Sequence, residues 1–578
     1  MSFIVPDASE YDVVVVGSGA GGLLSAIRAH DLGLRPIVIE KSDRYGGTSA
    51  VSGGAIWIPN NAFIGDQDSP AKALGYLQKV TEGKVPTAKL ERYVGLAPVM
   101  VDYLKSLGIE YYTNPYMPYP DYYPFVEGAA PGGRTMLIRP MDGGTLGEEF
   151  FRLRESYPEF KMFDKIALDL LDGGIIMARA KGWRRVVLRN LWRYWSDLPF
   201  RRRTHRDRLL TIGNALIGGL RKAMIDRNIP LALNTAMTGL EMDGTTVVAV
   251  TASAQGRPVR IGAAKAVILA SGGYEQSQEM RNEHFAQPTN PRWSATPRDN
   301  NVGDALTASR EAGAAVEFLD EAWWAPTVTI PYRHAPNILR NQALFFERGY
   351  PHSLAVNRLG KRFTNEICSY HQFGQAMLRD NAETGANLPC WLIFDADYRA
   401  RYPLGGLQPG WAMPDSKVPA DWFDTFLYRA DNLEALAGKI GVPADTLAAT
   451  VGRFNDHALK GEDPDFGRGA NVYNQFFGDP NHKPNRNLGP VAKAPFYAVR
   501  IDLGDLGSKG GPRTDEQARV LREDGSPIGG LYAIGNCSGS VMGPAYPGAG
   551  STLGASMTFG YAAAADIARK NDLSETTR

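Results

Sequence analysis

The sequence predicts an α/β fold in which a parallel sheet is buried between helices. The first observation is an apolar run at 11–16, followed by a glycine cluster, a helical stretch and a second apolar run at 34–39. This order of strand, glycine turn, helix and strand is typical of a βαβ unit. The second observation is that similar patterns of strand and glycine return at 266–273 and at 530–537.

The glycine cluster GSGAGG at 17–22 has the spacing of a Rossmann-like dinucleotide turn. Gly17 would permit the tight turn from strand to helix, Gly19 would let the backbone approach a pyrophosphate, and Gly22 would let helix and strand pack closely. Glu40 ends the second apolar run, near the spacing of about 20 residues at which an acidic side chain accepts hydrogen bonds from a ribose. The sequence therefore predicts a bound dinucleotide.

The length of 578 residues exceeds what a single hydrophobic core usually supports, so two domains are expected. Because nucleotide-type patterns lie near both ends of the chain and in its middle, the dinucleotide-binding domain is predicted to be discontinuous. We predict that 1–308 and 508–578 form this Rossmann-like domain. An α+β domain for substrate binding and catalysis is expected to be inserted between them, at 309–507.

Composition disfavours several classes of function. The 63 Lys and Arg residues against 62 Asp and Glu residues leave a net charge of +1, which provides no global field for attracting nucleic acid. The three cysteines have no CxxC spacing and the eight histidines show no metal-ligand spacing, so neither a disulfide framework nor a metal site is predicted. Signal-peptide features are missing from the first residues and no apolar run reaches about 18 residues, so a cytoplasmic protein is expected.

The sequence after Glu40, KSDRYGGTSAVSGGAIWIPNN, is rich in small and hydroxyl residues that would let a backbone lie against a flavin and its diphosphate. With ASGG at 270–273 and LYAIGN at 531–536, it resembles the large FAD-dependent family that contains fumarate reductase flavoproteins and ketosteroid dehydrogenases. The resemblance implies FAD as the cofactor. No second nicotinamide fingerprint follows a strand, which favours a dehydrogenase with a separate electron acceptor, a quinone or a similar compound.

The expected cofactor contacts belong to the glycine turn, the segment after Glu40 and the two later motifs. Gly535 and Asn536 are placed to meet the ribityl and phosphate region of FAD. The full set is Gly17, Ser18, Gly19, Ala20, Gly21, Gly22, Glu40, Lys41, Gly47, Thr48, Ser49, Ser52, Gly53, Gly54, Gly272, Gly535, Asn536 and Leu553.

Three further segments narrow the family. They are PDYYP at 120–124, NEICSYHQFG at 365–374 and YPGAG at 546–550. Together with the FAD motifs, they resemble the 3-ketosteroid Δ1-dehydrogenases over nearly the whole chain. The third motif departs from the usual family pattern, because Ala549 stands where Pro is usual.

Carried over by position, the resemblance assigns roles to four residues. Tyr546 and the backbone N–H of Gly550 would hold the 3-keto oxygen of a steroid. Tyr370 would be the general base, and Tyr122 would support it, with the adjacent Tyr123 as an alternative. The chain would then be an FAD-dependent 3-oxosteroid 1-dehydrogenase.

The chemistry of 1,2-desaturation agrees with these roles. A proton on carbon 2 is acidic only because the neighbouring carbonyl takes up negative charge, so two donors on that oxygen are needed. A free tyrosine has a pKa of about 10, so a tyrosine that acts as a base needs a supporting neighbour. As the proton leaves carbon 2, carbon 1 releases a hydride to the flavin and a double bond forms.

For three other residues with ring side chains the sequence leaves alternative roles open. Trp323 and Trp324 are expected to line the substrate cavity, and plain core packing is the alternative. His371, beside the predicted base, is interpreted as a structural residue or one that acts through its neighbours.

The stretch 181–208 is the only strongly basic one, with nine arginines interleaved with three tryptophans. Apolar residues at helical spacing precede it at 163–180, so an amphipathic element is expected to lead into a basic, aromatic one. We predict a peripheral contact of 181–208 with the inner face of a membrane, which would suit steroids with a long side chain. The alternative is that these arginines pair with acidic residues of the same fold or of a partner, or face solvent.

Three rival functions fit parts of the pattern. A 3-keto-5α-steroid 4-dehydrogenase would use the same cofactor fold and a related carbonyl clamp, and the sequence alone discriminates poorly against it. A fumarate-reductase-like enzyme would need converging Arg and His residues in the inserted domain. A flavin-binding carrier at a membrane surface would leave the three tyrosine motifs unexplained.

Overall fold

The N-terminal segment forms the βαβ unit expected from the sequence. β1 (Ser9–Val16) and β2 (Pro36–Ile39) pair in parallel, and α1 (Ala20–Asp31) connects them. Val13, Val14 and Val15 are fully buried, because a strand between two helical layers has no side that faces water. The structure is a computed structural model that describes residues 5–114, 118–177, 180–298, 300–332 and 335–575.

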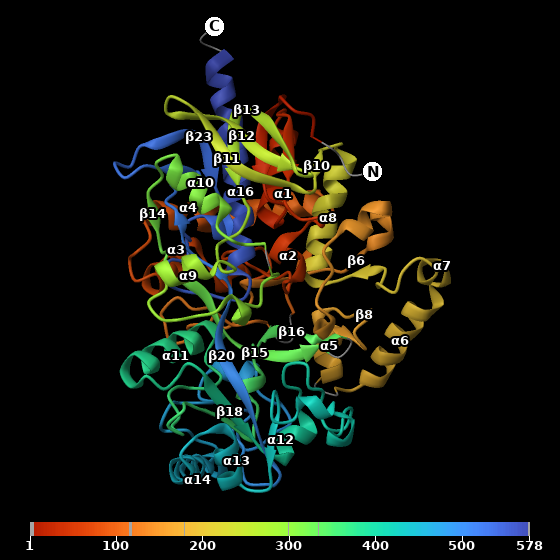
Figure 1. Cartoon of the computed structure of the whole chain (residues 1–578), viewed down its shortest axis with the longest axis vertical. Coiled ribbons are helices and arrows are strands. Elements are labelled where there is room, and N and C mark those ends of the chain that lie inside the picture. Colours follow the sequence, from red (N-terminus) through yellow and green to blue (C-terminus); the bar gives the residue numbers. More distant parts are fainter. Residues whose placement is uncertain (1–4, 115–117, 178–179, 299, 333–334, 576–578) are drawn as a thin grey trace.

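The main sheet has eight strands and joins segments from both ends of the chain (Figure 1). β13 (Arg257–Leu269) pairs in parallel with β1, and β23 (Pro527–Ala533) pairs in parallel with β13. Helix α1 packs against α8 (Ile212–Asp226) and α16 (Ser551–Glu575). The strand order is β10 (Leu231–Ala232), β2, β1, β13, β12 (Thr246–Ala254), β23 and β22 (Arg519–Leu521), with β11 (Thr235–Asp243) paired to β12. This topology agrees with the predicted Rossmann-like α/β fold.

A second sheet of six strands forms the other lobe, below the main sheet in Figure 1. Its strand pairs are antiparallel. The order is β16 (Ala335–Ala343), β15 (Ala322–Tyr332), β20 (Phe496–Ser508), β18 (Cys390–Phe394) and β17 (Ser353–Val356), with β19 (Tyr428–Ala430) paired to β20. The helices of this lobe are α11 (Tyr370–Thr384), α12 (Ala396–Arg401), α13 (Leu433–Ile440) and α14 (Ala444–Lys460). The domain boundaries at 308/309 and 507/508 stay a prediction.

A limb between the two lobes carries the basic stretch, at the right of Figure 1. It contains the short strands β7 (Lys161–Met162) and β8 (Ile166–Ala167) and the helices α5 (Leu170–Met177), α6 (Trp183–Ser196) and α7 (Leu198–Arg201). Helix α5 packs against α6. Among the described residues, no helix combines the length and the apolar character needed to cross a membrane.

The other elements of the described chain surround the two sheets. The helices are α2 (Gly47–Val51), α3 (Pro70–Val80), α4 (Thr87–Ser106), α9 (Gln278–His284), α10 (Asp304–Glu311) and α15 (Val472–Phe476). The strands are β3 (Ile56–Trp57), β4 (Tyr111–Tyr112), β5 (Thr135–Ile138), β6 (Met141–Asp142), β9 (Leu209–Leu210), β14 (Val316–Glu317) and β21 (Gly511–Pro512).

Candidate active site

A cavity of about 2340 Å³ extends from the glycine turn after β1 to the loops of the second lobe. Sites for a single small ligand usually measure about 300–1,000 Å³. The cavity therefore has room for a dinucleotide and for a substrate of several rings at the same time.

The glycine turn adopts the geometry that its sequence predicts. Gly17 has a φ of +109°, and a Cβ there would lie 2.5 Å from the carbonyl oxygen of Ala270, so only glycine fits. A Cβ on Gly22 would lie 2.2 Å from the carbonyl oxygen of Gly17, because the helix starts directly against the turn. Gly19 and Ala20 line the cavity at the N-terminus of α1, whose first turn has no acidic residue. A helix N-terminus of this kind fits the pyrophosphate of a dinucleotide.

Most of the predicted cofactor contacts lie in the cavity wall. They are Gly17, Gly19, Ala20, Glu40, Lys41, Gly47, Thr48, Ser49, Ser52, Gly53, Gly54, Gly272, Gly535, Asn536 and Leu553. Three others, Ser18, Gly21 and Gly22, are not among the lining residues. A Cβ on Gly21 would lie 2.2 Å from the Oγ of Ser556, so Gly21 and Gly22 serve the packing of α1.

Ser18 instead connects the glycine turn to the segment after β2. Its hydroxyl donates to Oε2 of Glu40 at 2.6 Å and accepts from the N–H of Gly46 at 2.9 Å. The other carboxylate oxygen of Glu40 accepts from the N–H of Ser42 at 2.9 Å. Glu40 is thereby held at the cavity wall, where its acceptor oxygens fit the ribose hydroxyls of a dinucleotide.

Three tyrosines that are far apart in sequence meet at one end of the cavity. Tyr370 is the first residue of α11, while Tyr122 and Tyr546 lie in loops. The hydroxyls of Tyr122 and Tyr370 are 3.0 Å apart, with Tyr122 donating. The ring of Tyr546 lies 5.2 Å from that of Tyr370 and 5.3 Å from that of Tyr122. All three side chains are buried and line the cavity, so the structure brings the predicted catalytic tyrosines together.

Burial dominates the electrostatics of these tyrosines. It raises the pKa of Tyr370 well above the ordinary value of 10.0. Burial also raises the pKa of Tyr546, although Tyr370, Thr552 and the backbone of Gly550 lower it. Because the charged form of a phenol is disfavoured away from water, all three hydroxyls are neutral at neutral pH and can donate hydrogen bonds.

The fourth predicted residue, Gly550, faces the same end of the cavity. Its φ is +95°, and a Cβ there would lie 2.5 Å from the carbonyl oxygen of Ala55. The contact between the Gly550 backbone and the Tyr546 hydroxyl places both donors beside one point. The unusual Ala549 is accommodated in the wall, where its carbonyl accepts from the Thr135 hydroxyl at 3.0 Å.

Tyr122 and Tyr123 differ in what they face. Tyr123 is not among the lining residues, and its hydroxyl accepts a hydrogen bond from the N–H of Tyr546 at 3.2 Å. Tyr122 therefore faces the cavity, and Tyr123 supports the loop behind it.

The expectation that Trp323 and Trp324 line the cavity is wrong. Neither is among the lining residues: the indole N–H of Trp323 donates to Asn536 at 3.0 Å, and Trp324 packs against Phe285 with ring centroids 5.0 Å apart. Both rings are buried in the core, and because they are adjacent on β15 they belong to two different clusters, Trp323 with Tyr546 and Trp324 with Phe285. His371 is also buried outside the wall, where its Nε2 lies 2.8 Å from the carbonyl oxygen of Pro544.

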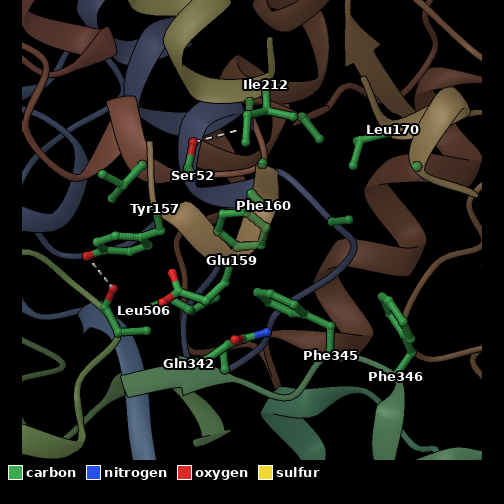
Figure 2. A pocket seen from close by; sticks show the side chains of 18 of the residues that line it. Ser52, Tyr157, Glu159, Phe160, Leu170, Ile212, Gln342, Phe345, Phe346 and Leu506 are labelled. Carbon is green, nitrogen blue, oxygen red and sulfur yellow. Dashed lines mark hydrogen bonds between the residues drawn. The ribbon is translucent and has the colours of Figure 1, made fainter. Parts of the chain in front are cut away.

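Several residues that line the cavity belong to no sequence motif, so the sequence alone could not identify them. Figure 2 shows Phe160, Phe345 and Phe346 around one part of the cavity, with the polar ends of Glu159 and Gln342 beside them. The buried hydroxyl of Tyr473 also lines the cavity and has no partner among the described residues. These residues come from the short 3-10 helix Pro158–Phe160, from β16 and the loop after it, and from α15, so only the packing of the two lobes brings them to the site.

A possible metal cluster, His352, Asp395 and Asp397, lies outside the cavity wall. The carboxylate of Asp395 accepts hydrogen bonds from four backbone N–H groups, those of residues 397, 398, 492 and 493. Asp395 therefore caps α12 and holds the segment at 492–493 against it.

Comparison with known proteins agrees with the geometry. The family model described as FAD binding domain matches residues 12–553, which makes the chain an FAD-dependent oxidoreductase. A 3-oxosteroid 1-dehydrogenase of Mycolicibacterium smegmatis is 39% identical, over 97% of each chain. The chain belongs to the 3-oxosteroid 1-dehydrogenase family. The predictions of the family, of the fold and of FAD are thereby confirmed.

One solved structure supports the same placement, and a second shares the fold. The 3-ketosteroid delta1-dehydrogenase from Sterolibacterium denitrificans, in complex with 1,4-androstadiene-3,17-dione, is 44% identical with a TM-score of 0.93, over 97% of this chain and 100% of that one. The 3-ketosteroid-delta4-(5alpha)-dehydrogenase from Rhodococcus jostii is 20% identical with a TM-score of 0.64, over 98% of each chain. At that identity, the second similarity concerns the fold alone.

Proposed function

We propose that the chain desaturates the bond between carbons 1 and 2 of 3-ketosteroids. The observation that carries the proposal is the convergence of Tyr122, Tyr370 and Tyr546 at one end of the cavity that also contains the dinucleotide turn. When bound, FAD supplies the acceptor for the hydride that leaves carbon 1.

The substrate carbonyl is held by two donors. The neutral hydroxyl of Tyr546 and the backbone N–H of Gly550 are in contact with each other and line the same cavity, so we expect both to donate to the same oxygen. Donors aimed at an oxygen that gains negative charge stabilise the transition state more than the ground state. This clamp makes the carbon 2 proton acidic enough to be removed.

Tyr370 takes the carbon 2 proton. It acts in its deprotonated form, and Tyr122 donates a hydrogen bond to its oxygen. Because burial raises the pKa of Tyr370, only a small fraction of its hydroxyl is deprotonated at neutral pH. The phenolate that does form is a correspondingly strong base.

The contacts to FAD are the predicted residues that line the cavity, with Glu40 at the ribose and Gly19 at the pyrophosphate. Ser18, Gly21 and Gly22 contribute by shaping the turn. The inserted domain at 309–507 would supply Tyr370, while 1–308 and 508–578 would supply the cofactor site and the clamp.

We also propose that 181–208 contacts a membrane surface, mainly through exposed apolar side chains and less through its charge. Five of the nine arginines form ion pairs within the fold: Arg189–Asp172, Arg193–Asp207, Arg203–Glu148, Arg206–Glu155 and Arg208–Asp142. That outcome matches the alternative of internal pairing for these five side chains.

The exposed face of α6 nevertheless suits an anionic lipid surface. Leu188, Trp192 and Trp195 are 66%, 74% and 59% exposed and share one helical face. Arg184 and Arg185, one turn earlier, are also exposed. Trp183 of the same helix and several residues of α5 line the cavity, so this face adjoins the route by which an apolar substrate would enter.

Incubation without oxygen tests the proposal. Androst-4-ene-3,17-dione and cholest-4-en-3-one should each yield the corresponding 1,4-dien-3-one with bleaching of the flavin absorbance. A 5α-reduced 3-ketosteroid separates the rival 4-dehydrogenase, because 1,2-desaturation gives a 1-ene whereas the rival gives a 4-ene. A dicarboxylate such as succinate should give no reaction.

A further inference from the structure

The loop that carries Tyr546 is held by side chains from distant segments. The carbonyl of Pro547 accepts from the hydroxyl of Tyr76 at 2.8 Å and from the N–H of Tyr122 at 2.9 Å. The carbonyl of Pro544 lies 2.8 Å from Nε2 of His371. Such contacts fix the backbone on both sides of the proposed clamp.

The peptide unit just before Tyr546 is held at both of its polar atoms. Its oxygen, the carbonyl of Ala545, accepts a hydrogen bond from Nζ of Lys509. Its N–H, that of Tyr546, donates to the hydroxyl of Tyr123 at 3.2 Å. The plane of this peptide is therefore set by two side chains, that of Tyr123 in the loop before β5 and that of Lys509 directly after β20.

Lys509 is fully buried, which is rare for a lysine. Its Nζ lies 4.2 Å from the ring centroid of Trp323, so the ring face stabilises the ammonium. Burial lowers the pKa of Lys509 to about 7, while the charge of Glu321 raises it. Burial lowers the pKa of the nearby His371, and the charge of Lys509 lowers it further. An amine donates hydrogen bonds in both protonation states, so the contact with Ala545 does not depend on the charge.

Trp323 connects this contact to the cofactor half of the cavity. Its ring lies 4.8 Å from that of Tyr546, and its indole N–H donates to Asn536 at 3.0 Å. Asn536 lines the cavity near Gly535. The group formed by Lys509 and Trp323 thus touches both the clamp loop and the wall that faces the cofactor.

We propose that Lys509 and Tyr123 are positioning residues that orient the Ala545–Tyr546 peptide, so that the Tyr546 hydroxyl meets the substrate carbonyl. The inference rests on the proposed clamp function of Tyr546. Neither side chain is among the lining residues, so neither touches the substrate. Their effect should therefore depend on whether the ligand has a carbonyl at carbon 3.

The test compares two ligands of similar size on the FAD-loaded protein. One is androst-4-ene-3,17-dione, and the other is androst-4-en-17-one, which lacks the 3-keto oxygen. The dissociation constant of each is measured from the change in flavin absorbance in the Tyr370→Phe background, where the 3-ketone is not turned over at a rate that reduces the flavin. Lys509→Met should weaken binding of the 3-ketone about tenfold, the scale of one lost hydrogen bond, and leave binding of the 3-deoxy compound within twofold. Tyr123→Phe should show the same selectivity with a smaller change.

Lys89→Met is the matched control, because Lys89 is also buried and donates to a backbone carbonyl, that of Gly539, at 3.0 Å. It should weaken both ligands equally or neither. The positioning role would be overturned if Lys509→Met and Tyr123→Phe weakened the binding of both ligands equally. It would also be overturned if both variants left the affinity for the 3-ketone unchanged. If Lys509→Met does not fold, Tyr123→Phe decides alone. A wild-type protein that binds the 3-ketone without any turnover would instead count against the proposed function.

Discussion

The hydroxyl of Tyr122 donates a hydrogen bond to the hydroxyl of Tyr370 across 3.0 Å, although 248 residues separate the two positions. Tyr122 lies in the loop before β5, and Tyr370 begins α11 of the second lobe. The proposed base and its support therefore come from different lobes, and the site is complete only when the lobes pack together.

Replacement of the base should abolish most of the turnover. Tyr370→Phe keeps the ring and removes the only group proposed to take the carbon 2 proton, so kcat should fall about 10²-fold or more while FAD is retained. The control is Tyr398→Phe, which also removes a buried hydroxyl, one that donates to the carbonyl of Glu347 at 2.9 Å outside the cavity wall. Near-normal turnover of Tyr370→Phe would show that the base is another residue.

The rate should rise with pH through the neutral range. The base acts deprotonated, and burial holds the pKa of Tyr370 well above its ordinary value of 10.0. The reactive fraction therefore grows about tenfold for each pH unit below that pKa, so kcat/KM should increase from pH 7 to pH 9 without a plateau. Stopped-flow measurement of flavin reduction over this range checks it. A plateau that begins below pH 8 would contradict a tyrosine with a raised pKa as the base.

A methyl group at Gly550 should disrupt the clamp. In Gly550→Ala the new Cβ would lie 2.5 Å from the carbonyl oxygen of Ala55, and the φ of +95° would be strained, which costs about 1–2 kcal/mol. Loss of one carbonyl donor lowers rates by about 10²-fold, so kcat/KM should fall by that order. Gly95→Ala in α4 is the control, since a Cβ there meets no atom within 4 Å. Equal kinetics of the two variants would contradict the role of Gly550.

The cofactor should be held without a covalent bond. No histidine or cysteine occurs among the described residues that line the cavity. Cys537, the nearest in sequence to the predicted contacts, is buried, and its thiol donates to the carbonyl of Leu269 at 3.1 Å. Acid precipitation should release the yellow chromophore into the supernatant. Chromophore that stays with the pellet would contradict the prediction.

The exposed face of α6 should bind anionic vesicles at low salt, and salt should weaken the binding because the attraction of Arg184 and Arg185 acts over about one Debye length. Cosedimentation should fall when Trp192 and Trp195 are replaced by Ser. Leu459→Ser, at a leucine that is 67% exposed on α14, should have no effect. Replacement of Arg201 would be a less direct test, because its guanidinium packs 4.1 Å from the ring centroid of Tyr194 and its loss would also remove this contact within the fold. If cosedimentation with vesicles is unchanged when Trp192 and Trp195 are replaced, this face is not the contact.

The sequence by itself determined the fold class and the presence of a dinucleotide site, because these depend on local patterns, whereas FAD was predicted from the resemblance to a family. The turn at Gly17 and the acidic strand end at Glu40 are set by backbone conformation and by spacing within one βαβ unit, which a short stretch of sequence contains completely. The predicted catalytic tyrosines came from motifs that resemble a family, and the structure places them together.

Only the tertiary structure decided what each side chain faces. Tyr122 and Tyr123 are adjacent and chemically identical, yet one lines the cavity and the other supports Tyr546 from behind. Trp323 is turned into the core, and Arg193 pairs with Asp207. Such outcomes depend on which residues from distant segments arrive within contact distance, and that information lies in the packing of the two lobes and not in any local run of residues.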